Sequence, residues 1–295
     1  MPAPSNGEAT APDSGLQAIE DRSYGPATST IDPGRAARFV AATRDDPARW
    51  SEHAPPGFVA ALLFSVAPSF LADETAAPFT EVLIHAEQQF RWDRPFVVGD
   101  TYSAVGSVLS VRERRGLYRV QFHVAVRDVE RRLTAAGTSV FLMGRGSERP
   151  PVSDRPEPAP GAQGRNDASV PTVLPGPGQP IPGLHRSAAR RDLQEYATAT
   201  GDFNPIHVDH DAALRAGLPG TVVHGLLTAS WAMQSFARLV PGPAPLQGMT
   251  IRFREPLFPA EPAVVTGVME DERSGRFEVA SGDRRVASGV AVLRE

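Results

Sequence analysis

Residues 225–240 read Gly225-Leu-Leu-Thr-Ala-Ser-Trp-Ala-Met-Gln-Ser-Phe-Ala-Arg-Leu-Val240, an apolar run interrupted by one charged side chain. A helix that is apolar on all sides is normally buried on all sides. Four strand-like segments follow it, at 247–256, 261–270, 275–281 and 284–293. A buried helix followed by consecutive antiparallel strands predicts a sheet wrapped around that helix.

A second informative stretch precedes this helix: Tyr196-Ala-Thr-Ala-Thr-Gly-Asp-Phe-Asn-Pro-Ile-His207. The helical pattern runs to Thr200, and Gly201 is a natural helix end. Pro205 cannot continue a helix and biases the preceding residue towards extended conformations. Asp202 and His207 are therefore expected on an irregular turn, with both side chains aimed at one small volume. A carboxyl group and an imidazole placed in this way suit shared acid–base chemistry.

The same residues also have an ordinary interpretation, because Asp, Asn and Pro are common turn residues. Taken alone, an Asx-type turn with a surface histidine explains 196–207 equally well. The nearby His224-Gly225 pair and the repeat described next favour the catalytic interpretation. His224 itself is expected to hold the loop before the helix, and Asp209 to fix the turn, with no part in the chemistry.

The first half of the chain repeats the pattern of the second. Asp32 is placed to cap a helix that begins at Pro33, and an apolar run at 58–71 predicts a buried helix. Further strand-like segments follow at 80–91, 101–112, 117–128 and 133–143. Local echoes strengthen the comparison: 39–45 parallels 196–202, and 56–58 parallels 224–226. Two such copies can join their sheets edge to edge, which removes one exposed edge from each.

These patterns divide the chain into four parts. Residues 1–30 are polar and contain scattered Gly and Pro, which predicts a disordered tail. Residues 31–145 form the first repeat. Residues 146–185 contain ten of the 29 prolines, a composition typical of a linker. Residues 186–295 form the second repeat.

Composition excludes several classes of function. The 295-residue chain has a formal charge of −4 and no block of like charge, so no nucleic-acid partner is expected. With no Cys it has no disulfide, thiolate metal site or Cys nucleophile. We find neither a signal-peptide pattern nor an apolar run of about 18 residues, so a cytoplasmic protein without a membrane span is expected. A metal site from His207, Asp209 and His210 is not expected, because such close neighbours do not converge easily.

At this point the residues resemble those of the MaoC-like dehydratases, also called (R)-specific enoyl-CoA hydratases. The motif of that family is roughly Tyr/Phe-Ala-x-x-(Ser/Thr)-Gly-Asp-x-Asn-Pro-(Ile/Leu)-His-x-Asp, followed by an Ala-rich stretch and His-Gly-(Met/Leu)-Leu. This chain matches both parts, at residues 196–209 and 224–227. The resemblance covers the second half, and the first half is similar to the degenerate copy in double-hotdog members. It implies an α+β double hotdog, in which each of two repeats has an antiparallel sheet wrapped around a central helix.

The resemblance also implies a reaction, in which water adds to a 2-enoyl thioester or leaves a 3-hydroxyacyl thioester. Asp202 and His207 would hold the water and exchange the protons, and Asn204 would orient this pair. The backbone N–H of Gly225, at a helix N-terminus, would stabilise the thioester oxygen as negative charge develops there. The implied substrate is carried on CoA or acyl carrier protein, and no metal or other cofactor is implied. A two-repeat chain fits either a monomer or a homodimer.

The chain departs from the family pattern in two places. In the first repeat Asp45 is present, but Trp50 falls where the histidine belongs, so one active site per chain is expected. Hydratases of the family often carry a Ser at about the place of Met233, whereas here Ser230 lies one turn earlier and is the candidate supporting residue. Because a fold does not fix a reaction, two alternatives also stay open: a hotdog thioesterase, and a non-catalytic protein that binds an acyl or polyketide-like ligand.

Overall fold

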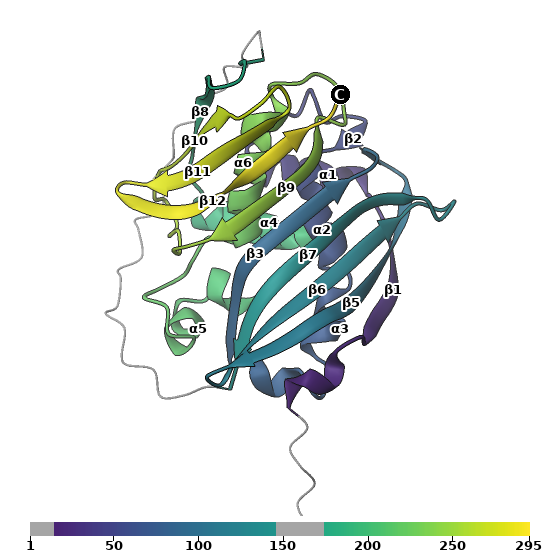
Figure 1. Cartoon of the computed structure of the whole chain (residues 1–295), viewed down its shortest axis with the longest axis vertical. Coiled ribbons are helices and arrows are strands. Elements are labelled where there is room, and N and C mark those ends of the chain that lie inside the picture. Colours follow the sequence, from purple (N-terminus) through teal and green to yellow (C-terminus); the bar gives the residue numbers. More distant parts are fainter. Residues whose placement is uncertain (1–14, 146–173) are drawn as a thin grey trace, which may run out of the picture.

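The computed structural model describes residues 15–145 and 174–295, and its sheet contains ten strands (Figure 1). Every neighbouring pair is antiparallel, and the order is β1-β5-β6-β7-β3-β9-β12-β11-β10-β8. The strands are β1 (Ser23–Thr30), β3 (Val82–Trp92), β5 (Thr101–Arg114), β6 (Leu117–Arg127), β7 (Leu133–Gly144), β8 (Pro180–Arg186), β9 (Leu246–Phe253), β10 (Ala263–Met269), β11 (Ser274–Ser281) and β12 (Arg284–Leu293). Two short strands, β2 (His53–Ala54) and β4 (Phe96–Val97), pair separately.

The strand order displays the internal repeat. From the centre outwards, the first repeat reads β3, β7, β6, β5, β1 and the second reads β9, β12, β11, β10, β8. The two halves meet where β3 pairs with β9, with Gln89 opposite Thr250 at the middle of the shared register. Glu87 and Arg252 face each other across this joint and form an ion pair at 2.8 Å. The predicted double hotdog is confirmed.

The helices pack against one face of the sheet (Figure 1). They include α1 (Pro33–Thr43), α4 (Arg190–Thr200) and α6 (Gly225–Ala237), whereas α5 (His210–Arg215) lies to the side and contacts η4 (Pro205–His207). Every residue of α6 after Gly225 is buried, and the helix contacts the strands of the second repeat, as its apolar sequence predicts. Helices α1 and α4, which correspond in the two repeats, pack against each other. Within the described residues, the helices are all too short or too polar to cross a membrane.

The predicted single helix over 58–71 is wrong. The chain instead forms a 3-10 turn η2 (Pro56–Phe58) and two short helices, α2 (Val59–Leu63) and α3 (Ala67–Leu71). Pro68 has no N–H to donate, and its ring would clash with the carbonyl four residues earlier, so it begins a new helix instead of continuing the old one. Three further 3-10 turns are η1 (Leu16–Ile19), η3 (Ala77–Phe79) and η4 (Pro205–His207).

The expected tail and linker also need correction. Residues 23–30, placed in the disordered tail, form β1, which pairs with β5 at the edge of the sheet. Residues 180–185, placed in the linker, belong to β8, which pairs with β10 at the opposite edge. Both strands contain Pro, which sheets accept at their edges because no ladder hydrogen bond is lost there. Within the predicted tail, η1 (Leu16–Ile19) is also ordered, and residues 1–14 and 146–173 of the two predictions lie outside the described residues.

Candidate active site

The turn that carries Asp202 begins at the C-terminus of α4. Gly201 caps this helix with a φ of +87°, a left-handed conformation that favours glycine, and its N–H donates to Ala197 O at 2.7 Å. The hydroxyl of Thr200 donates to Tyr196 O and accepts from Asp202 N at 3.2 Å. The predicted helix end at Gly201 is confirmed, and Asp202 leaves it in a fixed direction.

The turn continues through η4 to His207. Asn204 caps η4, with its side-chain oxygen accepting from Ile206 N at 3.3 Å, while its own N–H donates to Asp202 Oδ1 at 3.4 Å. Asp209 in turn caps α5 by accepting from Ala212 N at 3.0 Å. Asn204 thus contacts Asp202 through its backbone and shapes the turn through its side chain. Asp209 has the structural position expected for it.

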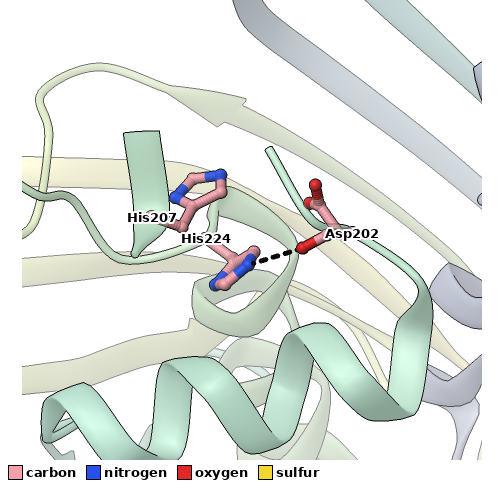
Figure 2. Close-up of side chains that lie close together, drawn as sticks. All are labelled: Asp202, His207 and His224. Atoms are coloured by element: carbon pink, nitrogen blue, oxygen red, sulfur yellow. Dashed lines mark hydrogen bonds between the residues drawn. The ribbon is translucent and has the colours of Figure 1, made fainter. Parts of the chain in front are cut away.

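The structure brings Asp202, His207 and His224 together (Figure 2). Each side chain offers a polar atom within 4.8 Å of those of the other two. Asp202 and His207 are each 8% exposed, and His224 is fully buried. Asp202 comes from the loop after α4, His207 from η4, and His224 from the residue that caps α6. The pair predicted from sequence therefore meets, with a second imidazole beside it.

Two hydrogen bonds fix the tautomers of the neutral rings. His207 Nδ1 lies 2.9 Å from Val222 O and His224 Nε2 lies 3.2 Å from Asp202 O. A carbonyl oxygen can only accept, so these nitrogens carry the protons. Neutral His207 therefore has its lone pair on Nε2, the atom available for acid–base work. The same two bonds join the turn to the segment just before α6, so the turn and the helix N-terminus face each other.

Burial dominates the electrostatics of the cluster. It raises the pKa of Asp202, against the opposing effect of the His207 charge. It lowers the pKa of His207, although Asp202 and the bond to Val222 oppose this. The pKa of His224 is lowered well below its ordinary value by burial and by repulsion from charged His207. Such opposed shifts in neighbouring groups are typical of sites that exchange protons.

The three side chains are close enough for a metal ion to be considered. However, the rings of His207 and His224 are stacked, with centroids 3.8 Å apart and planes at 25°. An imidazole binds a metal in its own plane through a nitrogen lone pair at about 2.0–2.1 Å. Nearly parallel stacked rings do not direct their lone pairs at one point, so this geometry fits proton transfer better than metal binding.

Gly225 begins α6 directly beside this cluster. The first N–H groups of a helix have no intrahelical acceptor, so they are available to a ligand. A Cβ atom at Gly225 would lie 3.2–3.5 Å from three ring atoms of Phe253, so the position has little room for a side chain. Phe253 also contacts His85 of the first repeat, with ring centroids 5.1 Å apart. Both repeats therefore contribute to the surroundings of Gly225.

Ser230 lies deeper in α6. Its hydroxyl donates to Leu226 O at 2.8 Å. The same oxygen packs so closely against Gly57 of the first repeat that a Cβ atom at Gly57 would lie only 2.6 Å from it. Burial and the Asp202 charge raise the pKa of Tyr196 well above its ordinary value, an effect that the Ser230 hydroxyl opposes. Tyr196 also contacts His224, with ring centroids 5.0 Å apart. Ser230 is therefore linked to the cluster through other side chains.

The corresponding place in the first repeat is built for packing. Trp50, at the position of the histidine, is 4% exposed and stacks under the guanidinium of Arg49 at 4.8 Å. Arg49 donates to Ala237 O and Val240 O, both at 2.7 Å, and so holds the C-terminal end of α6. Asp45 remains, and burial raises its pKa. These contacts support the expectation of one active site per chain.

Comparisons with known proteins show which family the chain belongs to. Residues 173–291 match the family described as MaoC like domain, and residues 23–143 match the FAS1-like dehydratase domain region. The chain is 32% identical over 118 residues to the 3-hydroxybutyryl-CoA dehydratase of Methylorubrum extorquens, a match that covers 38% of this chain and 75% of that protein. The chain belongs to the MaoC-like dehydratase family.

Two further comparisons extend over both repeats of this MaoC-like dehydratase. It is 28% identical over 234 residues to 3-hydroxyacyl-thioester dehydratase X of Mycobacterium tuberculosis, which covers 78% of this chain and 74% of that one. A solved structure described as a MaoC-like dehydratase superposes with a TM-score of 0.74 at 18% identity, covering 95% and 99% of the two chains. The shared fold therefore includes the degenerate first repeat.

Proposed function

We propose that this MaoC-like dehydratase adds water to a 2-enoyl thioester, or removes it from a 3-hydroxyacyl thioester, with Asp202 and His207 as its acid–base pair. The observation that carries the proposal is the bond from His207 Nδ1 to Val222 O, because it leaves Nε2 unprotonated within the cluster. The dehydratase and thioester names of the related proteins support the same reaction class. The acyl group is carried on CoA or acyl carrier protein.

In the hydration direction, the water oxygen bonds to Cβ of the enoyl group. One of Asp202 and His207 takes a proton from this water, and the other supplies a proton at Cα. The π electrons of the double bond move towards the thioester oxygen, and the resulting enolate collapses when Cα is protonated. Opposed pKa shifts suit the pair to this exchange, since a buried carboxyl group retains its proton more readily and a buried imidazole loses it more readily.

The thioester oxygen accepts a backbone N–H at the start of α6, with Gly225 as the proposed donor. A helix N-terminus carries partial positive charge, which stabilises the enolate more than the neutral thioester. Gly225 has no side chain, and the Phe253 ring packs against the place that a Cβ atom would occupy. Asn204 supports the pair by shaping the turn, and Ser230 supports it from within α6.

The substrate reaches a nearly closed site. Phe203, between Asp202 and Asn204, is 64% exposed. We place the entrance beside it, because it is the apolar surface nearest the acid–base pair in sequence. An aromatic ring at that place can pack against the carrier arm or the acyl chain as it enters.

The proposal is tested by product analysis with purified full-length chain and crotonyl-CoA. We expect loss of the conjugated enoyl absorbance, and mass spectrometry should detect a product heavier by one water with its thioester intact. Release of free thiol without hydration would identify a thioesterase instead. Binding of enoyl-CoAs of several chain lengths with no change in any of them would identify a non-catalytic binding protein.

A further inference from the structure

We propose that Arg35, in α1 of the first repeat, is a positioning residue for the catalytic turn of the second repeat. Its Nε donates to Ala199 O at 2.6 Å and its Nη2 donates to Thr200 O at 3.2 Å. These are the last two residues of α4, and Asp202 follows after Gly201 alone. One guanidinium group thus binds the C-terminus of α4, where the turn that carries Asp202 begins. The inference rests on the proposed function.

The interaction has a clear physical basis. The last carbonyl groups of a helix have no intrahelical donor, and a cation at a helix C-terminus also interacts favourably with the helix dipole. The guanidinium group is planar and presents its donors in a fixed fork, so two bonds to adjacent carbonyls constrain their direction as well as their position. A flexible cation would not fix the chain in the same way.

The surroundings of Arg35 indicate that this contact is specific. Its remaining side-chain bond is to the Ser29 hydroxyl at 3.3 Å, so its bonds within the described residues go to neutral oxygens. The side chain is partly buried, which lowers its pKa, and the charge of Asp32 opposes this shift only in part. Burying a cation without a bonded carboxylate costs free energy. What Arg35 provides in return is a fixed position for the C-terminus of α4.

A second contact joins α1 and α4 at their other ends. Asp192, in α4, forms an ion pair at 2.7 Å with Arg44, which caps the C-terminus of α1. Each repeat therefore holds the helix end of the other. Of these two helix ends, that of α4 leads into the proposed acid–base pair, and Arg35 is the residue that holds it. This gives the degenerate repeat a part in the chemistry without a reacting group of its own.

The same helix supplies a matched control. Arg38 lies about one turn after Arg35 and pairs with Glu195 of α4 at 2.9 Å, with the two side chains 47% and 36% exposed to solvent. An exposed ion pair of this kind contributes at most about 1 kcal/mol to stability. Arg38→Ala therefore removes a charge and a contact between the repeats while leaving the end of α4 in place.

The test compares Arg35→Met, Arg35→Lys and Arg38→Ala with wild type in enoyl-CoA hydration. Met retains the apolar stem but has no donors, and we expect it to lower kcat by about 10- to 100-fold with little change in KM, since small misplacements of reacting groups have effects of this size. Lys should restore part of kcat, and guanidinium added at low concentration should partly rescue the Met variant. Arg38→Ala should retain wild-type kcat.

Three readings of the results are distinguishable. If wild type hydrates no enoyl thioester, the proposed function fails. If wild type is active and Arg35→Met retains its kcat, the positioning role is wrong. If Arg35→Met loses kcat only in proportion to a lower folded fraction, measured by thermal melting, and neither Lys nor guanidinium restores it, Arg35 is merely structural. Should the Met variant fail to fold, Arg35→Lys and Arg35→Gln provide the same comparison.

Discussion

The imidazole of His207 lies stacked on that of His224, with ring centroids 3.8 Å apart. Each ring is also tied to the other side of the site, His207 through Val222 O and His224 through Asp202 O. His224 therefore packs against the ring of His207 and holds the backbone of Asp202 at the same time. This contact places both members of the proposed pair relative to the start of α6.

Replacing His224 tests this supporting role. His224→Phe keeps an aromatic ring for stacking but removes the donor to Asp202 O. We expect kcat for enoyl-CoA hydration to fall by about 10- to 100-fold, because the Asp202 backbone loses its anchor. His224→Gln, which retains an N–H donor, should be less impaired than the Phe variant. Equal activity in both variants and wild type would mean that the hydrogen bond has no part in placing Asp202.

The pH dependence of catalysis follows from the shared proton of the pair. The reaction needs one group to give a proton and the other to take one, so kcat/KM is expected to be bell-shaped. With His207 as the group that takes the proton from water, the acid limb reports its pKa, and burial lowers that pKa from its ordinary value of 6.5, so the limb is expected below 6.5. A pH–rate profile from steady-state kinetics measures this. An acid limb above pH 6.5 would contradict the assigned surroundings of His207.

Gly225 offers a steric test of the helix N-terminus. Gly225→Ala introduces a Cβ atom at 3.2–3.5 Å from the Phe253 ring, which must then move. We expect kcat to fall by about tenfold or more, because either the ring or the start of α6 must shift, and a shifted helix start no longer directs its backbone donor at the thioester oxygen. Adding Phe253→Leu should restore part of the activity by making room.

A glycine on an edge strand serves as the control for this prediction. At Gly183 a Cβ atom would meet only Val265 O, at 4.0 Å, so Gly183→Ala should leave kcat unchanged. Thermal melting of all variants separates loss of activity from loss of folded protein. Full activity of Gly225→Ala would show that the substrate does not approach α6 at this residue.

His85 predicts an acid-sensitive stability. Burial lowers its pKa from 6.5 to about 4, although Gln88 and Glu87 oppose the shift, so the unfolded chain takes up this proton at a higher pH than the folded chain does. The stability contributed by neutral His85 is thus complete above pH 6.5 and is lost as pH falls towards about 4, by at most about 3 kcal/mol. Urea unfolding of wild type and His85→Leu near pH 7 and near pH 5 measures this. The variant should have the smaller difference in unfolding free energy between the two pH values, and equal differences would contradict the lowered pKa of His85.

The inner strands of both repeats were predictable from the sequence because they alternate between buried and exposed side chains. The outermost strands β1 and β8 were not, and they are the same element in the two repeats. Each pairs along one side only and carries Pro, so neither has a pattern that distinguishes it from a loop. The break in 58–71 had a visible signal in Pro68, whose effect on the helix outweighs the apolar composition around it.

The candidate site was predictable as far as its residues lie in one short motif. Asp202, His207 and Gly225 are close in sequence, and the structure brings the turn and the helix start together. The stacking of His224 on His207 depends on how the loop before α6 folds back, which no local pattern specifies. Arg35 carries no sequence signal at all, because its acceptor Ala199 is 164 residues away and is a backbone carbonyl.

The most direct test of the central claim is the rate of crotonyl-CoA hydration by wild type, Asp202→Asn and His207→Gln, measured together by loss of the enoyl absorbance. Both substitutions conserve shape, so thermal melting should confirm that each variant folds. We predict that wild type hydrates the thioester and that each variant loses about 100-fold or more in kcat. Near-wild-type rates in both variants would contradict the assignment of Asp202 and His207 as the acid–base pair.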